Sequence, residues 1–540
     1  MRKLILFVIC GIYAIMMSAV PAKRERYTLT LADGSTIQAT AMGDENLHFF
    51  LTDDGRCLQC DTLGIAHFVD YELLQARWKA KAERRQAAIT KRMAARRKDP
   101  RNPMFGRKLG LVILVQFTDV KFHYTNDTFQ RFFNEDGYSD NINSGSVHDY
   151  FLDASYGLFD FSFDVVGPVT VSHNLSYYGS NDANGDDKYP ATMVCEAIKL
   201  VDNDVDFSNY DWDGDGMVEH IFVIHSGHDE AQSSTKTDIW SHAWTLSEGK
   251  DYGDGSGPVT ADGVVIDNYA TSSELRDRSG TNIAGIGTAC HEFTHCFGIP
   301  DFYDTAGSNF GMHSWSLMDY GSYNGNGGTP TGFTSYERMF CGWLDPIELH
   351  DPVAVQNMPA LTSEPVAYIL RNSGKEDEYF LFENRQKVGW DKYVGGHGML
   401  VLHVDYDSQA WYENTVNTVR SHQRMTIIPA DNSLYIGSLA GDTWPGTSRK
   451  KELSDASTPA GKFFNNNAEG NKRMNHSITE ISESSDGRIS FTFDEEALDI
   501  NAIHSSPFTI QGDIYDLQGR RWSKPGKGVY IVDGKKMMLQ

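Results

Sequence analysis

The sequence predicts an α+β fold in which one central domain lies between two β-rich regions. Three observations lead to this prediction. A His-Glu-x-x-His motif, whose histidines have helical spacing, occurs near the middle of the chain at 291–295. A continuous apolar run at 109–117 is typical of a buried strand. From 351 to 495, short β-type segments follow one another, which favours a β-sandwich-like domain.

Length and charge set the outer limits of the interpretation. A chain of 540 residues is long enough for two or three domains. Its formal net charge of −25 argues against nucleic acid as a partner. An acidic composition rich in Asp and Gly suits an exported protein that binds calcium.

The first 22 residues predict a secretory signal peptide. Arg2 and Lys3 precede the apolar run 4–17, which ends in small residues up to Ala22. The run is short for a bilayer span, although a retained membrane anchor is the alternative. No other run is long enough to cross a membrane, so we expect no stable membrane span and a secreted or cell-surface location.

Residues 23–105 predict a small β unit followed by a basic helical linker. Short alternating segments are separated by Asp-Gly turns at 33–34 and 54–55. The segment 77–108 then carries thirteen Lys or Arg against two acidic residues. We interpret 23–105 as a propeptide whose basic part is exposed to a processing protease, giving a mature N-terminus between 91 and 108. A solvated helix and a nucleic-acid-binding segment are the alternatives.

The central domain, 106–350, alternates between strand-like and helix-like segments. The apolar run opens it. The expected elements that follow are a helix at 147–152, a strand at 159–171, a helix at 193–201 and a strand at 219–225.

A calcium site is predicted just before the last of these strands. Aspartates alternate with glycines in this loop, so that several oxygen atoms can converge on one hard cation. The predicted ligands are Asp211, Asp213, Asp215, the Met217 carbonyl and Glu219. The loop is not an EF-hand, because the twelfth position is a phenylalanine rather than a glutamate. The alternative is a solvated Asp/Gly turn.

The His-Glu-x-x-His motif predicts a catalytic zinc site. His291 and His295 lie four residues apart, on one face of a helix, so both imidazoles reach one ion. Glu292 lies beside the first ligand, where it can take a proton from a metal-bound water. Gly298 allows the chain to turn sharply, and Asp301 then returns as the third ligand. The alternative is a core helix with hydrogen-bonded histidines.

The stretch 314–321 resembles the Met-turn of the metzincin metallopeptidases. That resemblance implies a metzincin-like catalytic domain with a mixed twisted sheet and an active-site helix. It also implies that Met318 forms an apolar floor under the metal and that Tyr320 binds a developing oxyanion. Asp301 departs from the commonest pattern of that clan, in which the third ligand is a histidine.

Over 27–495 the chain resembles the immune inhibitor A family of secreted bacterial metallopeptidases. The resemblance implies a zinc- and calcium-dependent endopeptidase made as a proenzyme and acting on proteins or peptides. It assigns zinc to His291, His295 and Asp301, and the base to Glu292. The matching pieces are 110–119, 213–219, 225–227, 239–242, 291–301, 314–321, 337–344, 378–386, 395–398 and 403–405.

Cys57 and Cys60 form a C-x-x-C pair inside the expected propeptide. A local disulfide is one interpretation. The other is that one thiolate occupies the open zinc position and keeps the proenzyme silent.

The last stretch, 496–540, predicts a small terminal hairpin from two short strand-like segments. It resembles C-terminal tails of exported bacterial proteins, some of which are sorting signals. A hairpin without targeting duty is the alternative.

Two classes of function therefore stay open. The first is a secreted zinc endopeptidase. The second is a non-catalytic, calcium-dependent surface adhesin or binding protein on the same scaffold. The presence of Glu292 favours the enzyme, because a binding protein does not need the base.

Overall fold

The computed structural model describes residues 26–43, 48–60, 65–73, 104–180, 187–230, 235, 237–251, 253–277, 279–303, 309–412, 414–494, 501–502, 514–515, 521–522, 528–532 and 535–539. They form a mixed α/β structure with several sheets. The chain divides into two compact units, Met1–Arg101 and Asn102–Gln540. The expected signal peptide and residues 77–103 of the basic segment lie outside the described residues, so both stay predictions.

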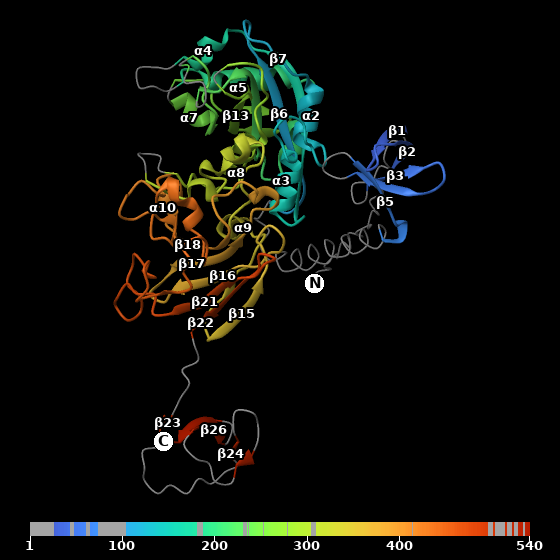
Figure 1. The fold of residues 1–540 in the computed structure, drawn as a ribbon. Coiled ribbons are helices and arrows are strands. Elements are labelled where there is room, and N and C mark those ends of the chain that lie inside the picture. Colours follow the sequence, from blue (N-terminus) through green and yellow to red (C-terminus); the bar gives the residue numbers. More distant parts are fainter. Residues whose placement is uncertain are drawn as a thin grey trace, which may run out of the picture. The chain divides into compact units, whose positions relative to one another are not determined.

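The first unit is a closed barrel of five short strands, coloured blue in Figure 1. Strand β1 pairs antiparallel with β2 and parallel with β5, and the parallel pairing closes the barrel without a free edge. Its small core includes Leu29, Leu58 and Ala66. Gly34 and Gly55 both have positive φ, as the Asp-Gly turns predict. The strands are β1 (Arg26–Leu31), β2 (Thr36–Gly43), β3 (His48–Thr52), β4 (Cys57–Cys60) and β5 (Ile65–Val69).

The central domain is organised around a five-stranded sheet of order β10-β13-β9-β6-β7. Four strands are parallel, and β10 pairs antiparallel with β13 at one edge, so the sheet is mixed. The apolar run at 109–117 corresponds to β6, whose residues 111–115 are all fully buried. The strands are β6 (Gly106–Gln116), β7 (Phe159–Thr170), β9 (Ile221–His228), β10 (His242–Thr245) and β13 (Asn268–Leu275).

Helices cover both faces of this sheet (Figure 1). On one face, α5 packs its buried residues against alternate residues of β6, such as Leu111 and Ile113. On the other face, aromatic side chains of β7 and β9 meet α8. The helices are α2 (Asn126–Asn134), α3 (Val147–Ala154), α4 (Leu175–Gly179), α5 (Pro190–Val201), α7 (Leu246–Asp251), α8 (Ile286–His295) and α9 (Ser335–Cys341).

Several shorter elements complete the central domain. A three-stranded sheet lies next to the predicted calcium loop, because its strand β8 is part of that loop. These elements are β8 (Met217–Val218), β11 (Val259–Ala261), β12 (Val264–Ile266) and the 3₁₀ helices η1 (Phe207–Tyr210), η2 (His313–Trp315) and η3 (Tyr320–Gly327).

The C-terminal region, 351–494, with the short strand β14 just before it, consists of two sheets whose side chains share one buried core. Two sheets packed across one core are the general form of a β-sandwich, and the β-sandwich-like domain stays a prediction. One sheet has the order β14 (Ile347–Glu348), β16 (Tyr368–Asn372), β17 (Lys375–Arg385), β18 (Gly398–Asp405) and β19 (Met425–Ile427). The other has the order β15 (Val353–Met358), β22 (Ile489–Phe493), β21 (Ser477–Glu483) and β20 (Leu453–Ser454). The short helices are η4 (Gly389–Asp391), α10 (Ser408–Tyr412) and η5 (Ile436–Gly441).

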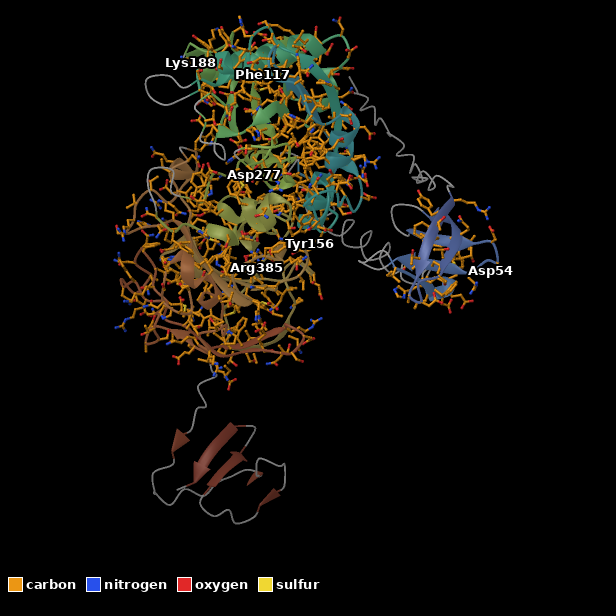
Figure 2. All side chains as sticks on the ribbon, turned by 45° about the horizontal axis from the view of Figure 1, so that its top comes forward. Asp54, Phe117, Tyr156, Lys188, Asp277 and Arg385 are labelled. Atoms are coloured by element: carbon orange, nitrogen blue, oxygen red, sulfur yellow. The ribbon has the colours of Figure 1, made fainter. Side chains whose placement is uncertain are left out.

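The C-terminal region packs directly on the central domain. Tyr156, labelled in Figure 2, lies at this junction, and its hydroxyl donates to the Leu361 carbonyl at 2.5 Å. Trp315, the last residue of η2, donates through its indole Nε1 to Asp442 Oδ2 at 2.8 Å. Side chains at this junction also contact the segment that carries the predicted zinc ligand Asp301, as described below.

The tail contains more strands than the predicted hairpin. Its described residues form one five-stranded sheet of order β23-β27-β26-β24-β25. A two-stranded hairpin alone is only marginally stable in water, and the additional strands give the sheet the pairing that it needs to be stable. The strands are β23 (Asn501–Ala502), β24 (Ile514–Tyr515), β25 (Arg521–Trp522), β26 (Gly528–Val532) and β27 (Lys535–Leu539). In the described part of the chain, no helix has the length and apolar character needed to cross a bilayer.

Candidate metal centre

Helix α8 carries the predicted motif and is fixed on both sides. Phe293, between the two histidines, is buried and stacks on Phe222 of β9 with ring centroids 4.6 Å apart. Its ring also packs on Phe163 of β7. At the start of the helix, a Cβ on Gly287 would lie 1.9 Å from the Ser322 carbonyl oxygen, so glycine is required there. Because one face of α8 is held by the sheet, its histidines face away from it.

The three predicted zinc ligands come together. His291 Nε2 lies 3.1 Å from Asp301 Oδ1, and His295 Nε2 lies 3.4 Å from the same oxygen. Gly298 has a φ of +83°, the left-handed conformation that turns the chain back after the helix. Ligand atoms of His291, Glu292 and His295 also lie within 4.8 Å of one another. These side chains thus form one cluster, as the sequence spacing predicts.

Backbone carbonyls orient both imidazoles. His291 Nδ1 lies 2.8 Å from the Leu317 carbonyl, and His295 Nδ1 lies 2.9 Å from the Ile299 carbonyl. A carbonyl accepts but cannot donate, so each Nδ1 carries a proton. In the neutral rings, each Nε2 then presents a lone pair towards Asp301, which is the orientation of a metal-ligating histidine.

The electrostatics of the cluster favour positive charge, as the pKa values of its side chains indicate. Burial lowers the pKa of His291, but Asp301 and Glu292 outweigh it and raise that pKa to about 9. Burial raises the pKa of Asp301, but the two histidines outweigh it and hold that pKa well below its usual value. Asp301 Oδ1 and Glu292 Oε2 are buried oxygens without a hydrogen-bond partner among the described residues. Two imidazoles, a carboxylate and unsatisfied oxygens fit a zinc ion.

Glu292 differs from Asp301, the other carboxylate of the cluster, in the direction in which its pKa is shifted. Its side chain is buried, and this burial raises its pKa, while the neighbouring histidines act in the opposite direction. A carboxylate whose pKa is raised is better suited to accept and return a proton near neutral pH.

A cavity of about 550 Å³ opens over the cluster. The edge strand β10 and the residue before it contribute one group of lining residues, 241–245. Aromatic side chains contribute another group, namely Trp240, Tyr269, Tyr303 and Trp411. Because β10 is the last strand of its sheet among the described residues, its outer edge can pair with an extended peptide.

The predicted Met-turn contacts the cluster through the Leu317 carbonyl, which binds His291 Nδ1. Met318 is fully buried, and its carbonyl accepts a hydrogen bond from the Phe302 amide at 2.7 Å. Tyr320 is 57% exposed and stacks on His313, and the described residues that line the cavity do not include it. Tyr303 does line the cavity, and burial together with the Asp301 carboxylate raises its pKa.

Sequence reasoning did not single out three cavity residues. Tyr303 lies two positions after Asp301, and this closeness to the motif is a signal that could have identified it from the sequence. His242 is held by the Trp240 carbonyl at 2.7 Å and the Tyr269 hydroxyl at 3.0 Å. Asn414 bonds to Asp301 from 113 residues away, and no local pattern predicts such a contact.

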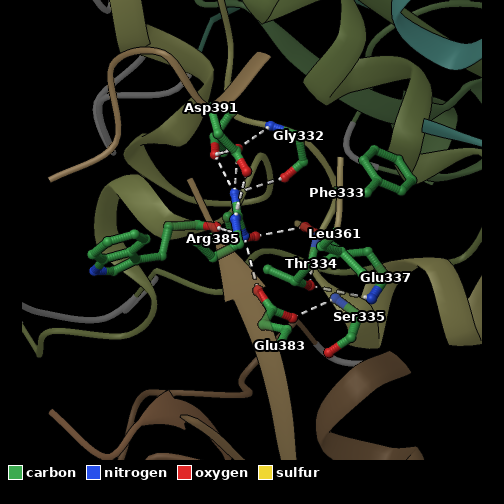
Figure 3. Close-up of polar contacts among 12 residues, drawn as sticks. Gly332, Phe333, Thr334, Ser335, Glu337, Leu361, Glu383, Arg385 and Asp391 are labelled. Carbon is green, nitrogen blue, oxygen red and sulfur yellow. Dashed lines mark hydrogen bonds and ion pairs between the residues drawn. The ribbon is translucent and has the colours of Figure 1, made fainter. Parts of the chain in front are cut away.

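A buried ionic network supports the Met-turn from the C-terminal region (Figure 3). Arg385 of β17 donates to the Trp315 carbonyl at 3.2 Å. Glu337 of α9 accepts from the Ser316 hydroxyl at 2.6 Å, and that hydroxyl accepts from the Met318 amide at 3.0 Å. The segment under the cluster is thus fixed by side chains from two other elements.

The predicted calcium loop is brought together in part. Ligand oxygens of Asp211, Asp213 and Glu219 lie within 4.8 Å of one another. Asp215 is not in this group, and its Oδ1 accepts from the amide of Met217 at 2.8 Å. Burial, with Asp213 and Asp211 nearby, raises the pKa of Glu219 to about 7. Calcium at this loop stays a prediction.

Comparisons with known proteins agree with the geometry. The family model described as immune inhibitor A peptidase M6, catalytic domain, matches residues 111–343. "Immune inhibitor A" of Bacillus thuringiensis subsp. alesti is 28% identical over 274 residues, which is 43% of this chain and 39% of that protein. "Pre-pro-metalloprotease PrtV" of Vibrio cholerae serotype O1 is 27% identical over 245 residues, which is 38% of this chain and 25% of that protein. The chain thus covers less than half the length of either relative.

Proposed function

Because residues 111–343 belong to the immune inhibitor A family of M6 peptidases, we propose that this chain is an exported zinc-dependent endopeptidase that hydrolyses internal peptide bonds. The observation that supports this most is the convergence of His291 Nε2 and His295 Nε2 on Asp301 Oδ1, with Glu292 beside them. All four residues line one cavity.

The proposed roles follow from the position of each side chain. Bound zinc supplies Lewis acidity, which activates a water and polarises the scissile carbonyl. Glu292 accepts the proton of the attacking water and later delivers it to the leaving amine. Asp301 and the two histidines hold the metal. The substrate backbone pairs with the outer edge of β10 and so passes over Glu292.

Two tyrosines compete for the role of oxyanion donor. Tyr320 has this role in the metzincin resemblance. Tyr303 lies in the cavity next to Asp301, which makes it a second candidate. Separate Tyr303→Phe and Tyr320→Phe variants distinguish them, because only the true donor lowers kcat when its hydroxyl is removed. Equal, unchanged kcat values would remove both from the mechanism.

The zinc proposal is tested by metal analysis of the purified, processed protein together with casein hydrolysis. We expect about one zinc per chain. Activity should be lost with 1,10-phenanthroline and return with added zinc. Protein without a transition metal, or hydrolysis that resists the chelator, contradicts the proposal. Absence of hydrolysis despite bound zinc would favour the adhesin or binding-protein alternative.

We also propose that the protein is made as an exported zymogen, with residues 1–22 as signal peptide and 23–105 as propeptide. The division of the chain at 101/102 supports a separate leading unit, and one relative is named a pre-pro-metalloprotease. The tail, 496–540, is proposed as a sorting signal. N-terminal sequencing of the active enzyme should find a start between 91 and 108. An active enzyme that starts at Lys23 contradicts the zymogen proposal.

The proposed calcium site rests on the grouped oxygens of Asp211, Asp213 and Glu219. Calcium that binds only the folded state raises Tm. Wild-type protein should therefore melt higher in millimolar calcium, and Asp213→Asn should reduce this shift. A wild-type Tm that does not respond to calcium contradicts the site.

A further inference from the structure

Asn414 belongs to the C-terminal region, yet its side chain lies against the third proposed zinc ligand. Its Nδ2 donates to Asp301 Oδ2 at 2.7 Å. In return, its Oδ1 accepts from the Asp301 backbone amide at 2.8 Å. One amide group therefore binds both the carboxylate and the backbone of Asp301. Such a two-point contact restricts the side-chain rotamer and the chain position together.

The contact leaves one oxygen of Asp301 for the metal. Oδ2 is taken by Asn414, whereas Oδ1 faces His291 and His295 at 3.1 and 3.4 Å. Oδ1 is buried and has no hydrogen-bond partner among the described residues. Asn414 thus determines which oxygen faces the imidazoles.

The backbone around Asp301 needs this support. Between α8 and η2, the described residues form neither helix nor strand. Side chains of the C-terminal region bind this segment instead. Asn417 Nδ2 donates to the Phe302 carbonyl at 2.7 Å, and Gln423 Oε1 accepts from the Gly311 amide at 2.7 Å. Trp411, from the α10 helix that precedes Asn414, lines the same cavity as His291.

We propose that Asn414 is a positioning residue of the metal centre and that the C-terminal region, through it, is part of that centre. This inference rests on the proposed function for the identity of the metal. Removing a partner that orients a ligand typically weakens metal affinity about 10- to 100-fold.

The backbone of Asn414 decides which variants are informative. Its φ is +53°, a left-handed conformation that asparagine and glycine tolerate better than alanine. Asn414→Gly therefore removes the side chain without steric strain. Asn414→Asp keeps the size and the acceptor but replaces the donor with a negative charge facing Asp301. Asn432→Gly is a matched control, because Asn432 is exposed and has a φ of +61°.

The experiment uses the full processed chain and measures zinc affinity by competition with a chromophoric chelator. The absorption spectrum of the cobalt-substituted protein and the Tm of the metal-free protein are recorded as well. We expect Asn414→Gly to bind zinc about 10- to 100-fold more weakly and Asn414→Asp to bind it more weakly still. The cobalt spectrum should change in both, and Asn432→Gly should match wild type in affinity and spectrum. Metal-free Asn414→Gly and Asn432→Gly should show similar small Tm shifts.

Each outcome decides the question. Asn414→Gly with zinc affinity within twofold of wild type overturns the inference while leaving the peptidase proposal intact. A wild-type protein that binds zinc but cleaves no peptide overturns the peptidase proposal. The zinc affinities of the variants then still test whether Asn414 positions Asp301. Wild-type protein that binds no zinc overturns both. If Asn414→Gly does not fold, Asn414→Asp decides; if neither folds, Asn414 is structural and the inference fails.

Discussion

Two buried polar clusters both contact the segment 315–317 but differ in how their charges are satisfied. In the network of Figure 3, Arg385 is fully buried and pairs with Glu383 at 3.0 Å and with Asp391. The second oxygen of Glu383 accepts from the Ser335 amide at 2.6 Å. In the candidate metal centre, by contrast, Asp301 and Glu292 each keep a buried oxygen without a hydrogen-bond partner among the described residues. Removing one member of a satisfied buried network is costly, whereas unsatisfied carboxylate oxygens beside imidazoles are typical of groups that can hold a cation.

Asp442 shows that a buried oxygen without a hydrogen-bond partner does not by itself indicate a metal site. Its Oδ2 accepts from the Trp315 indole at 2.8 Å, while its Oδ1 has no partner among the described residues. No cluster of metal-ligating groups in the described part of the chain includes it. This comparison leads to three predictions. Substitution of Glu292 should lower catalytic activity, substitution of Arg385 should lower stability, and substitution of Asp442 should change how stability depends on pH.

The largest expected effect is on activity, in Glu292→Gln. Removing a general base lowers the rate typically about 10²- to 10⁴-fold. Stability should not fall, because the substitution removes a buried charge that lacks a full set of partners. Peptide hydrolysis, zinc content and Tm are measured on the same preparation. Retained zinc with activity within tenfold of wild type would falsify the assignment of Glu292.

The next effect is on stability, in Arg385→Met. The substitution leaves Glu383 and Asp391 as buried charges without their cation, which typically destabilises by about 3–5 kcal/mol. Urea unfolding gives the change in free energy. As a control, Arg488→Met removes an exposed pair with Asp486 and should change stability by less than about 1 kcal/mol. Equal effects of the two substitutions would show that the buried network has no special role.

The smallest effect is a pH dependence, removed by Asp442→Asn. Burial raises the pKa of Asp442 to about 7. A folded-state pKa above the unfolded value contributes stability that is present at low pH and lost as the pH rises through about 7. Relative to wild type, Asp442→Asn should therefore be more stable at pH 8 than at pH 5, by on the order of a few kcal/mol. Asparagine can still accept from the Trp315 indole. Stability curves that run parallel across this range would contradict the raised pKa.

The sequence by itself determined the elements and the core of the site. Residues 111–115 are apolar without interruption because β6 is buried on both faces, so the pattern directly reports the strand. The four-residue spacing of His291 and His295, with Gly298 turning the chain back, brought the candidate ligands together through local geometry.

Only the tertiary structure decided the contacts between distant segments. It placed Tyr303 rather than Tyr320 in the cavity, closed the first unit through the β1–β5 pairing and brought Asn414 to Asp301. The physical reason is that periodicity reports which face of an element is buried, but not which partner covers it. A hydrogen bond across 113 residues leaves no trace in the local pattern, because it depends on how two distant segments of the chain meet.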